Sequence, residues 1–133
     1  MALQRKADRQ PRLVAIMDIG FADPVAYGAA ENAINLPGNA IVVGGALTVL
    51  TAWNSATTAT LKLGDAADDD RYTASAIDLK TAARTALTVT GYKHTVGEWL
   101  KATLAQTGTA ATAGAARLEV EYVVQGRSLS NQG

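Results

Sequence analysis

The residues most capable of chemistry stand together in one short stretch. Residues 64–72 read GDAADDDRY, in which aspartates at positions 65, 68, 69 and 70 follow a glycine and precede an arginine and a tyrosine. Clustered carboxylates can supply the hard oxygen ligands that Ca²⁺ requires, and a pair of them can act in acid–base catalysis. The stretch is therefore open to three interpretations: a divalent-metal site, a catalytic carboxylate site, or a tight solvated turn.

The spacing of these aspartates favours the turn. The pattern D-x-[DN]-x-[DN]-G of an EF-hand loop is absent, as is its closing glutamate. Consecutive side chains on an extended backbone diverge, so Asp68, Asp69 and Asp70 cannot all point at one ion. Aspartate side chains readily accept hydrogen bonds from nearby backbone N–H groups, and Arg71 would relieve the crowding of charge. We expect a self-capped connection after a strand, with a divalent ion at residues 65–70 as the open alternative.

Other catalytic and cofactor sites lack their signals. The sequence contains no cysteine and a single histidine, His94, which excludes thiolate and multi-histidine metal centres. His94 could be combined with Ser55 or Ser75 and an aspartate, but no G-x-S-x-G elbow supports a hydrolase. No P-loop and no G-x-G-x-x-G motif is present. We therefore expect no enzyme activity and no cofactor, and we interpret GYKHT, residues 91–95, as a polar loop between strands.

Length and charge narrow the class of protein. A chain of 133 residues fits one domain. Lys plus Arg and Asp plus Glu number 12 each, so the net charge is zero, which suits contact with other protein and argues against general nucleic-acid binding. No apolar run reaches the length of a membrane helix, and the start MALQRKADRQPR does not resemble a signal sequence. We expect a soluble protein that is made in the cytoplasm and has no membrane partner.

The elements that must position these residues have the pattern of strands. An apolar, β-branched run covers residues 13–19 and ends at Gly20, and residues 60–63 and 95–105 alternate. Residues 115–126, AARLEVEYVVQG, show the clearest period of two, with apolar residues at positions 118, 120, 122 and 124. Residues 21–39 predict loops with room for one short strand. Residues 73–86 could form one or two helical turns, and residues 86–92 are again rich in strand formers.

Residues 40–53, AIVVGGALTVLTAW, carry most of their bulk at odd positions, from Ile41 to Trp53. The pair Gly44-Gly45 inside this run indicates a bulge or a bend. A helix is the alternative, but two glycines would cost it about 2 kcal/mol relative to alanine. We therefore predict a bent strand that ends with Trp53 in the core.

Together these signals predict an all-β fold, a compact antiparallel β-sandwich over residues 13–127. A flexible basic N-terminal arm, residues 1–12, would precede it, and a polar C-terminal tail, residues 128–133, would follow. The arm could lie on an acidic protein surface, touch nucleic acid, or remain solvated. Trp99 is either an exposed interface anchor or a buried residue at the rim of the sandwich. The candidate protein-interface residues are thus Arg5, Lys6, Arg9, Arg12 and Trp99.

The order of these segments resembles a known family. The segment LPGNAIVVGGALTVLTAWNSATTATLKLGDAADDDRY, a Thr/Ala-rich middle with TGY, and TAGAARLEVEYVVQGR are similar to the small head decoration, or cement, proteins of tailed bacteriophages. The resemblance covers roughly residues 34–127 and carries over no catalytic or cofactor residue. It implies a jelly-roll-like sandwich on the outer surface of an icosahedral capsid of the HK97 type. There it would bridge neighbouring major capsid subunits, often as a dimer or trimer, in a virion assembled in the host cytoplasm.

A second function fits the same fold class. A β-sandwich can recognise carbohydrate or a receptor with its loops, as a module of a phage fibre or an adhesin. Sugar sites usually display aromatic side chains beside carboxylates, and aromatic residues make up only 5% of this chain. Tyr72, next to the aspartates, is the best candidate for such a contact.

Overall fold

The computed structural model describes residues 11–126, and every regular element among them is a β-strand. These are β1 (Leu13–Gly20), β2 (Ala30–Leu36), β3 (Ala40–Thr51), β4 (Thr58–Gly64), β5 (Ile77–Asp78), β6 (Arg84–Ala86), β7 (Lys93–His94), β8 (Glu98–Thr107) and β9 (Ala115–Val124). The predicted antiparallel β-sandwich is confirmed. No helix in this part of the chain is long and apolar enough to cross a membrane. The predicted arm and tail lie almost wholly outside the described residues.

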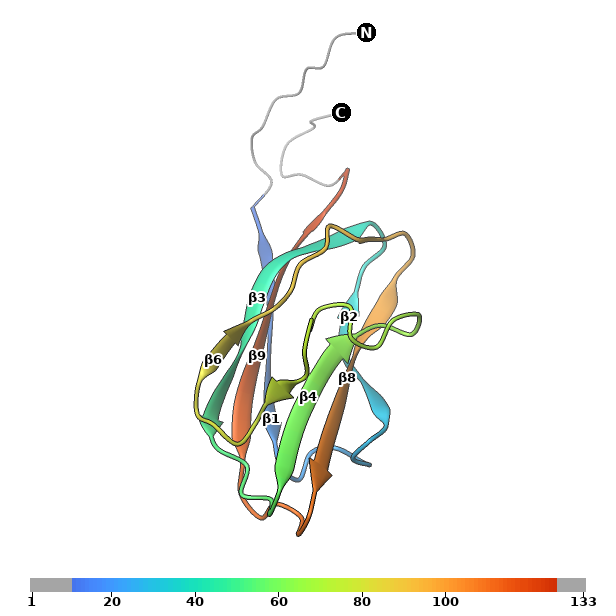
Figure 1. Cartoon of the computed structure of the whole chain (residues 1–133). Coiled ribbons are helices and arrows are strands. Elements are labelled where there is room, and N and C mark those ends of the chain that lie inside the picture. Colours follow the sequence, from blue (N-terminus) through green and yellow to red (C-terminus); the bar gives the residue numbers. More distant parts are fainter. Residues whose placement is uncertain (1–10, 127–133) are drawn as a thin grey trace, which may run out of the picture.

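The strands form two sheets that face each other (Figure 1). One has the order β1-β9-β3-β6, with β7 also paired to β3, and the other has the order β2-β8-β4-β5. The pairs are nested along the chain: β4 pairs with β5, β3 with β6, β2 with β8, and β1 with β9. This nesting is the arrangement of a jelly roll, in which a long hairpin is rolled into two layers.

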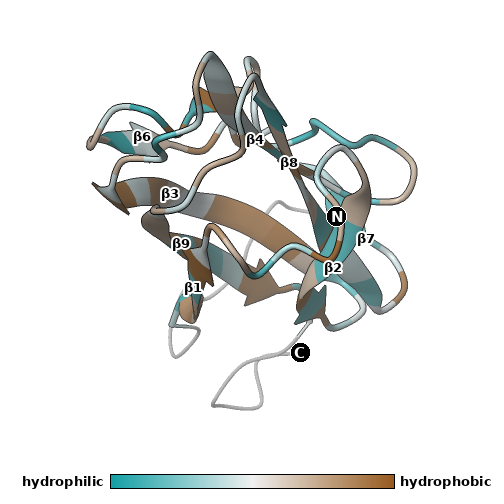
Figure 2. Ribbon diagram, turned by 90° about the horizontal axis from the view of Figure 1, so that it is seen from below, coloured by the Kyte–Doolittle hydropathy of each residue, from teal (hydrophilic) through white to brown (hydrophobic). Residues whose placement is uncertain are grey.

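The core lies between the sheets, and leucine is its most frequent residue. Leu47 and Leu118 come from the first sheet and Leu61 and Leu100 from the second, and none of them is exposed. Complete burial of such a side chain stabilises the fold by about 1.5–3 kcal/mol. Figure 2 shows brown, hydrophobic bands along β3 and β9, which occupy the middle of their sheet. The alternation predicted for residues 115–126 is confirmed, because the side chains at positions 118, 120 and 124 are buried.

The paired glycines of β3 form the predicted irregularity. The register with β9 shifts between Val42 and Gly44, and Gly45 has a φ of 133°. One extra residue reverses which positions face the core. Buried positions are therefore even before the shift (Val42) and odd after it (Leu47), so the bulky odd positions from Ile41 onward do not all lie on one face.

The helical turns predicted for residues 73–86 are absent. This segment forms the short strands β5 and β6 instead, because its backbone groups bond to neighbouring segments of the chain. The Leu79 N–H donates to the Ala59 carbonyl, and the Trp53 N–H donates to the Leu79 carbonyl. Leu79 is fully buried, and tertiary packing thus overrides the helix propensity of alanine and lysine. β2 is the short strand expected within residues 21–39, and residues 87–92 contain no strand.

Candidate functional site

The aspartate stretch is the turn that follows β4. Its first carboxylate, Asp65, is 2% exposed, and its Oδ1 accepts the N–H groups of Ala67 (3.0 Å) and Asp68 (2.9 Å). The chain passes so close to itself here that a Cβ on Gly64 would lie 2.1 Å from the Asp68 carbonyl oxygen. Glycine is therefore required at the end of the strand, and Asp65 caps the turn, as the composition predicted.

The other aspartates of the turn point into solvent. Asp68, Asp69 and Asp70 offer carboxylate oxygens within 4.8 Å of one another, and all three are exposed. Asp69 pairs with Lys62 at 2.9 Å, and Asp68 accepts the Asp70 N–H at 3.3 Å. Because Asp70 meets the carboxylate of Asp68, its pKa is raised. These contacts neutralise part of the local charge from within the chain.

Arg71 completes the environment of Asp65. Its Nε donates to Asp65 Oδ2 at 2.7 Å, and its guanidinium stacks 3.7 Å above the centre of the Tyr92 ring. Burial favours the neutral form of Asp65, but the hydrogen bonds from Arg71 and from the backbone of Asp68 and Ala67 outweigh it, so the pKa of Asp65 is lowered. Asp65 is therefore an ionised carboxylate that is closed off from solvent.

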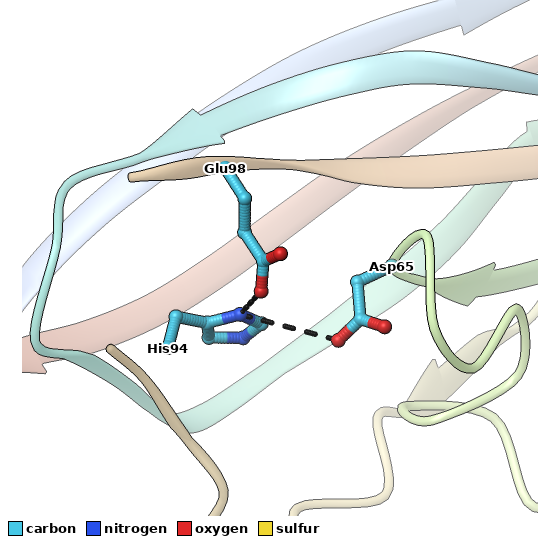
Figure 3. Close-up of side chains that lie close together, drawn as sticks. All are labelled: Asp65, His94 and Glu98. Atoms are coloured by element: carbon cyan, nitrogen blue, oxygen red, sulfur yellow. Dashed lines mark hydrogen bonds and ion pairs between the residues drawn. The ribbon is translucent and has the colours of Figure 1, made fainter. Parts of the chain in front are cut away.

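His94 joins this carboxylate inside the sandwich. The predicted polar loop at residues 91–95 is wrong at this position, because His94 lies in β7 and is fully buried. Its Nδ1 forms a hydrogen bond with the Glu98 carboxylate and lies 3.9 Å from Asp65 Oδ2, as Figure 3 shows. Its Nε2 lies 2.6 Å from the Tyr72 hydroxyl. We call Asp65, Arg71, Tyr72, His94 and Glu98 the buried polar cluster.

The directions of these hydrogen bonds follow from the chemistry of the partners. Nδ1 faces carboxylates, which only accept, so it carries a proton and donates to Glu98. Burial, with a contribution from Asp65, raises the pKa of Tyr72, so its hydroxyl stays protonated and can donate to Nε2. Among the described residues no buried side-chain polar atom lacks a partner. The cluster is a satisfied chain of donors and acceptors.

The cluster also contains a set of metal-ligating groups. Asp65, His94 and Glu98 each offer a ligand atom within 4.8 Å of the others, and imidazole with carboxylates is a donor set that zinc accepts. In this structure, however, Asp65 Oδ2 holds Arg71 and Nδ1 holds Glu98. The groups are used to connect β4, β7 and β8, which gives the cluster a structural role. The cluster was not predicted from the sequence, because its members come from two stretches, residues 65–72 and 94–98, that are far apart in the sequence.

The candidate interface residues lie in different places. Arg5, Lys6 and Arg9 fall outside the described residues, whereas Arg12 is exposed and pairs with Glu121 at 3.0 Å. Trp99 is 41% exposed on β8, opposite Asn35 of β2, so it is not a buried rim residue. Val14 and Ile16 of β1 are also exposed, which was not predicted. Both faces of β1 carry apolar residues, so the sequence does not show which of them are exposed.

Comparisons with known proteins identify the fold. A chain of the cyanophage Pam1 capsid asymmetric unit has 24% sequence identity and a TM-score of 0.66, and the match covers 93% of this chain and 92% of that one. A chain from the acid-stable capsid of Helicobacter pylori bacteriophage KHP30 has 16% identity and a TM-score of 0.68, with 91% and 94% covered. A chain from the capsid of Ralstonia phage GP4 has 18% identity and a TM-score of 0.66, with 96% and 93% covered. No protein-family model and no curated protein sequence matches.

Proposed function

We propose that this protein is a structural component of a phage virion, which binds the outer surface of the icosahedral capsid and cements neighbouring major capsid subunits. The observation that carries the proposal is the fold likeness to chains of three phage capsids, which extends over more than nine-tenths of each chain in both directions. The resemblance of the segment order to head decoration proteins supports the same proposal. Assembly in the host cytoplasm belongs to the same proposal.

The buried polar cluster supports a mechanical role over a catalytic one. A reacting group must meet its substrate, but His94 is fully buried, and the side chain of Asp65 is 1% exposed. The cluster ties together β4, β7 and β8, as a rigid scaffold requires. The structure also removes the aromatic contact considered for a carbohydrate-binding module, because Tyr72 is 1% exposed and its ring cannot stack on a sugar.

A cementing protein acts through linkage. A ligand that binds only the assembled shell stabilises that shell by RT ln(1 + [L]/Kd) at each site, about 2.7 kcal/mol when the free protein is at a hundredfold excess over Kd. A protein that touches two capsid subunits also gains from effective concentration, because its second contact is intramolecular. Contacts that are individually weak can therefore hold a shell together when they are repeated over its surface.

The proposal is tested with capsid shells that lack this protein. Shells are mixed with the purified full-length chain, sedimented through a density gradient, and heated in the presence of a DNA-binding dye that reports rupture. We expect the protein to sediment with the shells at a saturating ratio and to raise the rupture temperature. A protein that stays at the top of the gradient, or that binds without changing the rupture temperature, would contradict a cementing function.

A further inference from the structure

Strand β1 lies at the edge of its sheet, with β9 on one side and no strand among the described residues on the other. Its eight residues keep an unbroken register with β9 and contain no proline and no lysine. Val14 and Ile16 expose 54% and 64% of their surface on its outward face. Natural edge strands are usually blunted by charge, proline or a bulge, because an open edge is a template for another strand. β1 has none of these devices between Leu13 and Met17.

The hydrogen bonds at the end of β1 show which backbone groups face the open edge. The Phe21 N–H donates to the Gly114 carbonyl at 3.1 Å, on the β9 side, whereas the Gly20 N–H donates to the Asp23 carboxylate at 2.6 Å. Backbone groups alternate between the two sides of a strand in an antiparallel sheet. The N–H and C=O groups of Val14, Ile16 and Asp18 therefore point away from β9, toward the open edge.

The open part of this edge has defined limits. At one end Asp23 covers both groups of Gly20, because its carboxylate accepts the Gly20 N–H and its own N–H donates to the Gly20 carbonyl. At the other end stands Pro11, which has no N–H to offer. The free segment is thus Arg12–Asp18, and its midpoint is Ala15.

This segment is complementary to itself when it is reversed. An antiparallel copy centred on Ala15 places Val14 opposite Ile16 and Leu13 opposite Met17, and it places Arg12 opposite Asp18. The backbone N–H and C=O groups of Val14 and Ile16, which face the open edge, then lie opposite each other, as a hydrogen-bonded pair requires. A shift of one residue would place backbone groups that face the open edge opposite groups that face β9, which are already paired. A shift of two residues, centred on Ile16, would set Val14 against the Asp18 carboxylate.

The charges at the two ends of the segment also agree. Arg12 lies beside Glu121 at 3.0 Å, and Asp18 lies beside Arg117 at 3.3 Å. The reversed copy extends each pair, so that positive and negative groups alternate across the seam from Glu121 to Arg12 and then to Asp18 and Arg117 of the second copy. Opposite charges directly across strands are stabilising, and like charges are destabilising.

We propose that β1 pairs antiparallel with β1 of a second copy of this chain, about a two-fold axis at Ala15, so that the first sheets of the two copies become one continuous sheet. A closed two-fold contact uses the same surface on both copies. The pairing covers Val14 and Ile16 and occupies the open edge. It is independent of capsid binding, since a dimer could form whether or not the protein attaches to shells.

The oligomeric state of the full-length chain is the first test, measured by analytical ultracentrifugation over a range of concentrations. We expect a dimer, and we expect Ile16→Lys to weaken it at least about tenfold in Kd, because it places a charge in the seam. Val25→Lys is the matched control, since Val25 is 94% exposed and lies outside β1, in the segment between β1 and β2. A chain that stays monomeric, forms a trimer, or remains dimeric with Ile16→Lys overturns the proposal.

The register is tested separately by charge exchange. Arg12→Asp and Asp18→Arg each place like charges across the seam, so each variant alone should dissociate. An equimolar mixture places opposite charges at both ends, and it should form mixed dimers that a tag on one variant captures. Failure of the mixture to associate more tightly than either variant alone argues against this register.

A single introduced thiol provides a direct readout of the two-fold axis, because the chain has no cysteine. Ala15→Cys would face its twin in a non-hydrogen-bonded pair, with Cα atoms about 4.5 Å apart, which is within the range for a disulfide. Ile16→Cys is the control, because its twin lies two positions away along the seam. Under mild oxidation we expect covalent dimers from Ala15→Cys, and equal yields from the two variants would contradict the axis at Ala15.

Discussion

Among single residues, His94 has the most partners in the buried polar cluster. It accepts from Tyr72, donates to Glu98 and packs edge-on against the Tyr92 ring. Replacement by alanine leaves a buried hydroxyl and a carboxylate without partners, so we expect His94→Ala to lower the free energy of unfolding by about 2–4 kcal/mol. Chemical denaturation followed by tryptophan fluorescence measures this. Thr95→Ala, at the exposed neighbouring position, should change it by less than about 0.5 kcal/mol.

Asp65 gives the molecule a dependence on acid. The pKa of Asp65 is lowered in the folded state. As the pH falls below about 4, this carboxylate is therefore protonated in the unfolded chain before it is protonated in the folded chain, and the free energy of unfolding decreases. Asp65→Asn removes this term. We expect it to cost about 2–3 kcal/mol at pH 7, because Arg71 loses its carboxylate, and to flatten the decline on acidification.

Denaturation curves collected from pH 7 down to acid measure both effects. Asp69→Asn, which changes an exposed carboxylate of the same turn, is the control and should leave the curve close to that of the unaltered protein. An Asp65→Asn protein that loses stability with acid as steeply as the parent would show that other carboxylates govern the response.

At the scale of elements, the bulge in β3 decides which side chains enter the core. Gly45 has a φ of 133°, and a Cβ there would lie 2.2 Å from the Glu119 carbonyl oxygen. We expect Gly45→Ala to lower the free energy of unfolding by about 2 kcal/mol or more. Gly44→Ala is the matched control, because its Cβ would meet the flexible Glu121 side chain at 3.4 Å. Equal losses from the two variants in denaturation would contradict this account of the bulge.

The elements differ in how far sequence could predict them. β4 and β9 were predictable because each alternates between a buried and a solvated face, so the period of two is visible in residues such as Leu61, Lys62 and Leu63. The bulge was predictable from Gly44-Gly45, but which positions turn toward the core on each side of it depends on the register with β9. β5 and β6 were missed because two or three residues carry no period, and only their neighbours hold them extended.

The buried polar cluster was beyond prediction for a similar reason. That aspartates cap the turn after β4 was predictable, because a turn is local and its hydrogen bonds join residues that are adjacent in the sequence. His94 lies 29 positions further on, in a two-residue strand, and nothing local distinguishes a buried histidine from one in a polar loop. The contact depends on the pairing of β7 with β3, which is a property of the whole topology.

For the whole molecule, Trp99 tests the proposed attachment to shells. A tryptophan that is 41% exposed can anchor an interface, and its loss should weaken binding while leaving the core intact. We expect Trp99→Ala to raise the Kd for shells at least about tenfold and to leave the melting temperature unchanged. The co-sedimentation assay measures the first and calorimetry the second. Val25→Ala is the control, and binding equal to that of the parent would exclude Trp99 from the contact.

The nested strand order also sets when this molecule can fold during synthesis. β9 is among the last elements to be translated, yet it lies between β1 and β3 and contributes Leu118 and Val120 to the core. Until residues 115–124 have left the ribosome, the first and third strands have no partner in common and the leucine layer lacks its centre. A nascent chain therefore cannot complete this sheet before β9 has been made, and a chain that ends before residue 115 would lack the central strand between β1 and β3.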